Sequence, residues 1–459
     1  MNIYLDVETA VRELDSKILL GVIAASRGHE IIISHSTEIL RGLKSGILSP
    51  GVFHNKSLTP SKDRIAVNQN FIDKGFIITS IDEEGGLVDH GYKPATYRFS
   101  NISVEQASAI FTWGPEDTET LKKIYFKDSS KIFMTGSPRA DLWKNSFSDY
   151  WNTPNGKPNR NFLLVSSNFS LANNPRYFHN IFKLYKKIGY YGLDPELMEK
   201  HFGTISENYQ NMYEFIKVIK QLSKINKFDI VVRPHPSENI EPWKVFLDGV
   251  PNVHIIREGS ITPWLKESFA VLHNGCTTAL EATFSKKPIL TFIPFKHKFS
   301  REVANELGFI VKSVEELIDK VNVIFNAKKF NDSKEDSNQL PEVITKKIYF
   351  DENELAAMKM IKVWERLNNQ KLSKSTNWLK FRFLLIIMSL RDSTVKVLKK
   401  LFPYIFGFYE ENHKFPPLNK EHILKKIGSF QKILGIKDKI ELKFLSERTI
   451  LLKCIKKDE

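Results

Sequence analysis

The chain has 459 residues, of which 42% are apolar and 26% are charged, and its formal net charge is +14. This composition excludes a disordered, collagenous or disulfide-stapled chain, and the length corresponds to two or three domains. Cys276 and Cys454 lie far apart without metal-ligand spacing, so we expect a reducing compartment and no cysteine-based zinc site. No apolar run is long enough for a spanning helix, and the first residues lack a secretory pattern, so neither feature is expected.

Residues 1–155 alternate short apolar runs with segments of helical length. The runs MNIYLDV, HEIIISHS, FIITSID, AIFTWG and KIFMTGS are predicted strands, and LDSKILLGVIAASRG is a predicted helix that ends at Gly28. Strands separated by helix-length segments favour βαβ units and a parallel sheet. The polar run at residues 152–161 is the best candidate for a linker. We therefore predict a first Rossmann-like domain over residues 1–155.

A second alternating series fills residues 156–345. FLLVSSN is a predicted strand, residues 206–225 form a predicted helix, and FDIVVRPHP, VHIIREG, AVLHNG and PILTFIP supply further strands. The sequence thus predicts an α/β protein with two doubly wound, parallel-sheet domains that face a cleft. Open parallel sheets bind ligands at the carboxyl ends of their strands, so the motifs at strand exits are the candidate site.

The remaining region, residues 346–459, is basic and rich in apolar residues. Residues 371–459 contain 20 Lys and Arg against 9 Asp and Glu, so +11 of the net charge lies there. Residues 377–409 interleave Lys and Arg with aromatic and aliphatic side chains, as in helices that lie in a membrane interface. Packed helices or a nucleic-acid surface are alternatives, but no nucleic-acid-binding motif accompanies the basic residues. We expect a membrane-surface contact and no nucleic acid.

Three adjacent acids follow the expected strand FIITSI in the segment Asp82-Glu83-Glu84-Gly85-Gly86. Adjacent carboxylates repel one another, which tends to raise at least one pKa, as a general acid or base requires. The two glycines permit unusual dihedral angles and close backbone approach. The alternative is a polar turn without chemistry.

Two further segments leave strands of the second series. In Arg233-Pro234-His235-Pro236, the prolines fix the chain around Arg and His, which can both donate to a phosphate, although a rigid surface turn is the alternative. The segment from His273 to Ala282 opens a helix, and its Thr hydroxyls and amides could hold an anion, although a plain N-cap is the alternative. Its candidate nucleotide-binding residues are Asn274, Gly275, Thr277, Thr278 and Glu281.

Weaker polar groups leave two other strands, and several familiar motifs are absent. The segment ending at Asp141 follows KIFMT, and Ser166, Ser167 and Asn168 follow FLLV, so each could line the cleft. The chain has no GxxxxGK[ST] and no strand-linked GxGxxG, so ATPase and dinucleotide-binding functions are disfavoured, and it has no convincing DxD and no HExxH. We expect a site without a metal or another cofactor.

Together these motifs resemble those of a known family. Glu83-Glu84-Gly85, His235-Pro236 and Thr277-Thr278 are similar to the D/E-D/E-G, H-P and Ser/Thr-pair motifs of bacterial polysialyltransferases and Kdo transferases, which are GT-B glycosyltransferases that use CMP-activated sugars. DEEGG, TWG, TGSPRAD, LLVSSNFSLAN, RPHP and NGCTTALEA extend the resemblance to surface carbohydrate biosynthesis proteins over roughly residues 1–300. The chain has Thr-Thr where others of the group have Ser-Ser.

The resemblance implies roles for individual residues. Glu83 would be the catalytic acid or base, supported by Glu84, and a retaining enzyme would also need a nucleophile, for which Asp82 and Asp141 are candidates. The CMP phosphate would be bound by His235, Thr277 and Thr278, with Arg233 helping to neutralise the leaving group. Pro236 would belong to the nucleotide-binding site as the second residue of the H-P motif. The first domain would take the acceptor and the second the nucleotide sugar.

The expected function is therefore transfer of a nonulosonic or ulosonic acid from its CMP form to a lipid-linked or oligosaccharide acceptor. The enzyme would lie at the inner face of the cytoplasmic membrane, held there by residues 377–409. A CDP-glycerol-type glycerophosphotransferase and an NDP-hexose GT-B transferase are rival enzymes with a similar motif set. A non-catalytic protein that binds membranes or nucleic acid through the basic tail is a rival of a different class.

Overall fold

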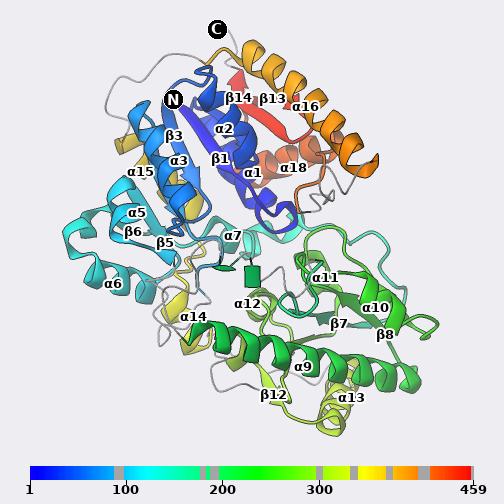
Figure 1. The fold of residues 1–459 in the computed structure, drawn as a ribbon. Coiled ribbons are helices and arrows are strands. Elements are labelled where there is room, and N and C mark those ends of the chain that lie inside the picture. The colour runs from blue at the N-terminus through cyan, green and yellow to red at the C-terminus, as the bar shows by residue number, and fades with distance from the viewer. Residues whose placement is uncertain are drawn as a thin grey trace. The chain divides into compact units, whose positions relative to one another are not determined.

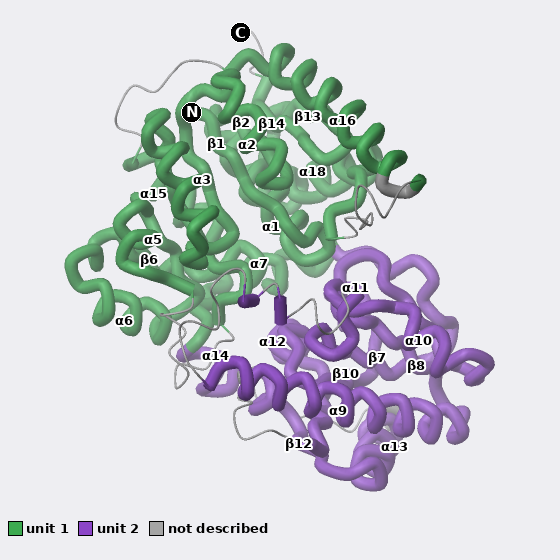
Figure 2. Tube along the Cα trace, viewed as in Figure 1, with its two compact units in different colours: residues 1–86, 95–150, 347–459 green, residues 87–94, 151–346 purple. Residues whose placement is uncertain are grey.

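The computed structural model describes residues 1–86, 98–175, 182–183, 185–186, 196–295, 303–330, 340–367, 376–401 and 414–455. The chain divides into two compact units (Figure 2). Unit 1 comprises residues 1–86, 95–150 and 347–459, and unit 2 comprises residues 87–94 and 151–346. Each unit is a largely parallel β-sheet with helices packed on it (Figure 1), which confirms the α/β class and the two Rossmann-like sheets. The cleft expected between the two domains stays a prediction.

Unit 1 is built on an eight-stranded sheet with the order β13-β14-β2-β1-β3-β4-β5-β6. All neighbours from β2 to β6 are parallel, and the central strands are buried along their whole length because helices cover both faces. The strands are β1 (Asn2–Asp6), β2 (Glu30–Ser34), β3 (Gly51–Asn55), β4 (Ile77–Ile81), β5 (Ala109–Thr112), β6 (Ile132–Met134), β13 (Lys439–Ser446) and β14 (Thr449–Ile455).

The helices of unit 1 lie on both faces of this sheet (Figure 1). One face carries α1 (Ala10–Ser26), α7 (Pro138–Asp141), α15 (Ala356–Leu367) and α18 (Lys420–Leu434). The other carries α2 (Ser36–Lys44), α3 (Lys62–Asp73), α5 (Asn101–Gln106), α6 (Pro115–Ile124) and α16 (Trp378–Leu401). The 3-10 helices η2 (Phe126–Lys131) and η3 (Asn145–Tyr150) complete the unit. Alternate residues of each strand, such as Tyr4, Phe53 and Ile78, form the core beneath the second group of helices.

The C-terminal chain is part of unit 1, whereas the sequence suggested a separate region over residues 346–459. β14 pairs antiparallel with β2 and continues the sheet. Trp364 of α15 is fully buried, and its indole Nε1 donates to Oγ1 of Thr79 (3.1 Å). Phe430 of α18 stacks on Tyr150 with ring centroids 4.3 Å apart. The apolar residues of the tail therefore fill the core of unit 1 and cover the edge of β2, which would otherwise present unpaired backbone groups.

The expected membrane segment overlaps α16. Its residues 402–409 lie outside the described part of the chain. Among the helices that the structure describes, none combines the length and the apolar character that crossing a membrane requires.

Unit 2 is built on a six-stranded, wholly parallel sheet with the order β12-β11-β10-β7-β8-β9. Its strands are β7 (Phe162–Ser166), β8 (Asp229–Arg233), β9 (Val253–Ile255), β10 (Ala270–His273), β11 (Ile289–Phe292) and β12 (Phe309–Val311). Counted in chain order, this is the 3-2-1-4-5-6 arrangement of the dinucleotide-binding fold, in which the direction of winding reverses between the first and fourth strands. The reversal here lies between β7 and β10.

The helices of unit 2 cover both faces of its sheet. The first face carries α9 (Leu197–Ile225), α10 (Glu241–Phe246) and α13 (Val314–Phe330), whose apolar residues share one core with the strands. The second carries α11 (Thr262–Glu267) and α12 (Thr278–Phe284), and η5 (Val303–Glu306) and α14 (Glu342–Lys347) follow along the chain. The helix expected at residues 206–225 is confirmed, but it begins earlier, at Leu197.

Candidate functional site

The acidic segment after β4 forms a tight turn at the carboxyl end of the strand. The amides of Gly85 and Glu84 donate to the carbonyl (2.9 Å) and to Oδ1 (3.0 Å) of Asp82. The indole Nε1 of Trp113 also donates to the Asp82 carbonyl (2.7 Å). A Cβ atom at position 85 would lie 2.3 Å from the Trp113 ring, so only glycine allows this close approach. The turn is thus fixed against the exit of the neighbouring strand β5.

Glu83 is buried in unit 1 and paired with a buried cation. Nζ of Lys17, on α1, lies 2.6 Å from Oε1 of Glu83, and Nη1 of Arg139 donates to the Glu83 carbonyl (2.7 Å). Burial acts to raise the pKa of Glu83, but the charges of Lys17 and Arg139 outweigh it and the pKa is lowered. The carboxylate is therefore ionised at neutral pH, and its ion pair ties the turn to α1.

Glu84 is the exposed carboxylate of the turn. Nη2 of Arg98 donates to its Oε2 (2.5 Å), and Nη1 of Arg12 donates to its Oε1 (3.2 Å). Although desolvation acts to raise it, these two charges hold the pKa of Glu84 well below its usual range. Burial raises the pKa of Asp82, and Arg98, with Nε 3.2 Å from Oδ2, offsets this only in part. The pKa values of these neighbouring carboxylates are thus pushed apart, because burial dominates at Asp82 and the arginine charges dominate at Glu84.

Glu13 is a fourth carboxylate at this cluster, and the sequence analysis did not single it out. It lies one turn before Lys17 on α1, and its residue is 0% exposed. Nη2 of Arg12 donates to Oε1 (2.9 Å), and the amide of Glu8 donates to Oε2 (2.8 Å). Burial, together with the charge of Glu83, raises the pKa of Glu13 to about 7 in spite of Arg12. The sequence signal is an acid four residues before a lysine in the first half of a largely apolar helix.

Asp141, a candidate nucleophile in the sequence, lies at the start of α15. Its Oδ1 and Oδ2 accept from the amides of Ala356 (3.0 Å) and Ala357 (2.9 Å), and Nζ of Lys144 lies 2.8 Å from Oδ1. The residue is 1% exposed. These contacts satisfy the first amides of a helix, so the placement favours a capping role over a catalytic one.

In unit 2, the residues that follow β7 and β10 meet at the reversal point of the sheet. The amide of Asn168 donates to Oδ1 of Asn274 (2.7 Å), and Nδ2 of Asn274 donates back to the Asn168 carbonyl (3.2 Å). Nδ2 of Asn168 also donates to the carbonyl of Gly275 (3.0 Å). The structure therefore brings together two segments that lie more than a hundred residues apart in the sequence, as the strand-exit argument predicted.

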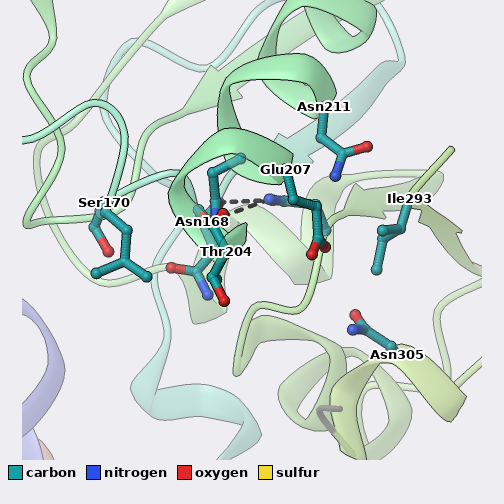
Figure 3. A pocket seen from close by; sticks show the side chains of 10 residues that line it. Asn168, Ser170, Thr204, Glu207, Asn211, Ile293 and Asn305 are labelled. Atoms are coloured by element: carbon teal, nitrogen blue, oxygen red, sulfur yellow. Dashed lines mark hydrogen bonds between the residues drawn. The ribbon is translucent and has the colours of Figure 1, made fainter. Parts of the chain in front are cut away.

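These two asparagines line a polar pocket of about 230 Å³ (Figure 3). α9 supplies much of its wall, and the exits of β7, β10 and β11 together with η5 supply the rest. Among the described residues, the buried Oδ1 of Asn305 has no hydrogen-bond partner. The sequence analysis missed the α9 residues because they lie far from any strand exit. The lining residues are Asn168, Ser170, Leu171, Thr204, Glu207, Asn208, Asn211, Asn274, Ile293 and Asn305.

Small side chains also join the end of β7 to the start of α12. Oγ of Ser166 lies 2.8 Å from Oγ1 of Thr278 and donates to Sγ of Cys276 (3.4 Å). Ser166 and Thr278 are both buried, so their hydroxyls satisfy one another. Thr277, the N-cap residue of α12, is half-buried, and its side chain makes no capping hydrogen bond. Of the Thr pair, Thr277 is therefore the more accessible to a ligand.

His273 shapes the turn between β10 and α12. Burial lowers its pKa to about 3, so the ring is neutral. Its Nδ1 accepts from the amides of Gly275 (3.0 Å) and Cys276 (3.3 Å), which leaves the ring proton on Nε2, 2.9 Å from Oγ1 of Thr291. Gly275 adopts a φ of 88°, a conformation that favours glycine.

Glu238, which the sequence analysis missed, organises the loop after β8. Its Oε1 accepts from Oγ of Ser167 (2.7 Å) and from the amide of His235 (3.2 Å), and its Oε2 accepts from Nε1 of Trp243 (2.9 Å). Glu238 is 0% exposed, so it is a buried carboxylate held by several donors. His235 is half-buried, and its Nδ1 accepts from the amide of Ser237 (3.2 Å).

Two arginines brace the same loop. Nη1 and Nη2 of Arg233 donate to the carbonyls of Glu258 (2.9 Å) and Gly259 (2.6 Å), and its guanidinium lies over the Trp264 ring. Nη2 of Arg257 donates to the carbonyl of Pro236. Burial lowers the pKa of Arg233 to about 10. These contacts favour a structural role for Arg233.

Glu281 has a similar internal contact on α12. Its Oε2 accepts from Oγ1 of Thr262 (2.8 Å), and both residues are buried. The bond joins the starts of α11 and α12, so it favours a structural role for Glu281 beside the ligand-binding role expected for it.

No family model matches the chain, and no curated protein matches it. Solved structures with a similar chain include a co-structure of S. aureus MnaA with UDP (TM-score 0.47, 13% identity), which covers 82% of this chain and 98% of that one. Another is UDP-GlcNAc 2-epimerase from Neisseria meningitidis bound to UDP-GlcNAc (TM-score 0.43, 13% identity; 80% and 100% covered). A third is the wall teichoic acid polymerase TagF with CDPG (TM-score 0.44, 13% identity; 81% and 90% covered).

Proposed function

We propose that the protein is a GT-B glycosyltransferase that transfers a nonulosonic or ulosonic acid, of Kdo, sialic or pseudaminic/legionaminic type, from its CMP-activated donor to a growing bacterial surface glycan. The observation that carries the proposal is the polar pocket at the reversal point of the unit 2 sheet, lined by Asn168 and Asn274. Open α/β sheets bind nucleotides at this point, because loops from strands wound in opposite directions diverge there.

The pocket suits an uncharged, polar part of the donor. Among the described residues that line it, Glu207 is the only charged one, and carboxamides supply several donors and acceptors. The buried Oδ1 of Asn305 supports binding of a ligand hydroxyl or amino group, which would give this atom its hydrogen bond. Ribose hydroxyls and the cytosine edge are groups of that kind. The proposal needs no metal and no other cofactor.

The phosphate of the donor is assigned to His235 and Thr277. Both are half-buried at strand exits of unit 2, and either can donate to a phosphate oxygen. A single phosphate needs less compensating charge than a diphosphate, which is consistent with a pocket wall without Lys or Arg among its described residues. Arg233 then acts as a positioning residue that holds the loop of His235.

The acidic turn of unit 1 is assigned the catalytic carboxylates. Glu84 is exposed and Asp82 is partly exposed, so these two are assigned the contact with substrate, whereas the buried Glu83 positions the turn. The resemblance implies the reverse, with Glu83 as the catalytic residue and Glu84 in support. As the acceptor oxygen bonds to the anomeric carbon, the bond from that carbon to the CMP phosphate breaks and CMP leaves. A carboxylate takes the acceptor proton, and ionised Glu84 stabilises the positive charge that develops on the sugar.

The enzyme is assigned to the inner face of the cytoplasmic membrane, where it would meet a lipid-linked acceptor. The excess of basic residues in the C-terminal part of the chain supports this location, because the cytoplasmic leaflet is anionic.

The donor is tested by thermal unfolding of the full-length protein with CMP, CDP, UMP and UDP. A ligand that binds the folded state raises the midpoint, and we expect the largest rise with CMP. A preference for UDP would overturn the CMP assignment, and a preference for CDP would favour glycerophosphate transfer.

Catalysis is tested by donor hydrolysis with CMP-sugars, CDP-glycerol and UDP-sugars. We expect Glu84→Gln to lower turnover of a CMP-sugar by roughly 10²–10³-fold and to leave the CMP-induced stabilisation unchanged. Glu105→Gln is the matched control, since Glu105 is an exposed acid elsewhere in unit 1, and it should keep full activity. Absence of turnover with every donor would overturn the enzymatic proposal.

A further inference from the structure

α16 is apolar on two opposite faces, and only one of them is used for packing. Phe381 and Leu385 are buried in the core of unit 1. A Cβ atom at Gly42 of α2 would lie 2.5 Å from the Phe381 ring, so the two helices pack closely. Asp392 pairs with Arg41 of α2 (2.6 Å). One side of α16 is thereby fixed to unit 1 from Phe381 to Asp392.

The other side of α16 carries a stripe of exposed apolar side chains. Leu379 is 77% exposed, and Phe383 and Leu390 are each 65% exposed. Positions i, i+4, i+7, i+8, i+11, i+18 and i+22 fall on one face of a helix. At a rise of 1.5 Å per residue, the stripe runs for about 33 Å. We call it the α16 stripe; its members are Leu379, Phe383, Ile386, Ile387, Leu390, Val397 and Leu401.

Basic side chains border this stripe on both sides. With about 100° per residue, Lys380 and Arg391 lie on one flank and Arg382 lies on the other. All three are exposed. Ile47 joins Leu379, Phe383 and neighbouring side chains of α16 around a shallow apolar groove. An apolar stripe with cations on both edges matches a membrane interface, where apolar side chains enter the acyl region and cations meet anionic headgroups.

We propose that the α16 stripe is a membrane-docking surface that lies flat in the interface of an anionic lipid bilayer. Basic flanks select this occupant over a second copy of the chain, because two copies in contact through this face would bring like charges together. Fixation of the opposite face to unit 1 means that docking holds the folded unit, and not a loose tail, against the lipid. The proposal does not depend on the glycosyltransferase chemistry.

The test is co-sedimentation of the full-length protein with vesicles of phosphatidylcholine alone and of phosphatidylcholine mixed with phosphatidylglycerol. We expect binding to the mixed vesicles that weakens with added salt. Phe383→Ser combined with Leu390→Ser should reduce it at least about tenfold. Phe126→Ser combined with Val245→Ser removes two equally exposed apolar side chains outside α16 and should leave it unchanged.

The contribution of the basic residues is tested with Lys380→Glu combined with Arg391→Glu. The control combines Lys122→Glu with Lys220→Glu, which change exposed lysines outside α16. We expect the α16 pair to abolish the preference for phosphatidylglycerol and the control pair to retain it. Binding that persists in Phe383→Ser/Leu390→Ser would overturn insertion of the stripe and leave only charge attraction.

Two further measurements separate the remaining outcomes. The wild-type chain could instead bind neither vesicle type and form a dimer that dissociates in Phe383→Ser/Leu390→Ser. That result would mean that the α16 stripe joins two copies of the chain, and it would overturn the lipid proposal. Nucleotide-induced stabilisation, measured on the same variants, reports folding and the proposed donor site. A variant that loses vesicle binding but keeps the nucleotide-induced stabilisation is therefore altered in membrane binding and not in folding or at the donor site.

Discussion

Nζ of Lys17 lies 2.6 Å from Oε1 of Glu83, and their side chains are only 1% and 6% exposed. The pair joins the middle of α1 to the turn after β4, two parts of unit 1 that are far apart in the sequence. Removing two charges from water costs free energy, and the attraction between them offsets that cost only while both remain. The ion pair therefore makes the position of the acidic turn depend on α1.

We predict that Lys17→Met destabilises unit 1 by about 3–5 kcal/mol, because the buried Glu83 carboxylate loses its ion-pair partner. Hydrogen exchange of the amides of α1 measures this loss as the free energy of local or global opening. The double variant Lys17→Met/Glu83→Gln should recover part of it. Lys157→Met breaks a pair with Glu267 in unit 2 that is about one-third exposed, and hydrogen exchange of unit 2 amides should show a loss of less than about 1 kcal/mol. Equal losses for both single variants would contradict the role of burial.

Glu13 predicts a pH dependence of stability with a definite sign. Its pKa is about 7 in the folded protein against 4.5 in the unfolded chain, so between these values the folded state binds more protons. The free energy of unfolding contributed by Glu13 therefore falls as the pH rises from about 4.5 to 7. Glu83 changes stability only at lower pH, because its pKa is lowered and its stabilising contribution is lost as the pH falls below about 4.5.

Glu13→Gln tests this dependence because glutamine cannot titrate. Relative to the wild type, the variant should gain stability as the pH rises from about 4.5 to about 7, by at most roughly 3 kcal/mol. Arg12, Lys17 and Glu83 face this carboxyl, so the difference in the free energy of unfolding at any one pH also reflects lost hydrogen bonds. The change of that difference with pH is therefore the quantity that tests the raised pKa. Parallel stability profiles for the two proteins would refute the raised pKa.

The polar pocket of unit 2 predicts a selective loss of nucleotide binding. Asn208 lines the pocket, and its Nδ2 donates to the Thr204 carbonyl of its own helix, so Asn208→Leu fills the pocket with little loss of packing. We expect this variant to lose the CMP-induced rise in the unfolding midpoint. Gln210→Leu, an exposed position of the same helix, should retain it. An unchanged rise in Asn208→Leu would place the nucleotide elsewhere.

Removal of residues 371–459 is predicted to unfold unit 1 rather than merely detach it from membranes. The truncation deletes α16, α18 and the β13–β14 hairpin, and Ile450, Leu451 and Leu452 are almost fully buried. Loss of this core and exposure of the β2 edge should give aggregation or a much lower unfolding midpoint. A soluble, cooperatively folded truncated protein would contradict the assignment of the tail to unit 1.

Several residues of the site were predictable because strand exits can be recognised in a sequence. Asp82, Asn168 and Asn274 each follow a short apolar run, and parallel strands deliver their exits to one edge of a sheet. Glu13 and Glu238 were not predictable in this way. Each is a buried acid whose role depends on partners from other elements, and no local pattern specifies those partners.

The sequence did not specify the roles of individual charged residues. Arg233 and Asp141 have the chemistry that a phosphate site or a nucleophile needs, but backbone carbonyls surround the first and backbone amides surround the second. A buried backbone group must find a hydrogen-bond partner, and the fold decides whether a side chain serves the backbone or a ligand.

The order of apolar runs and polar exits alone determined the α/β class, the two parallel sheets and the strand ends that carry polar groups, because periodicity and turn chemistry are local. Only the tertiary structure decided that the basic tail completes unit 1 through β14, and that Lys17 neutralises Glu83. It also decided which face of α16 packs and which is left exposed. Those outcomes depend on contacts between distant segments, whose geometry is set by the burial of apolar surface in the whole unit.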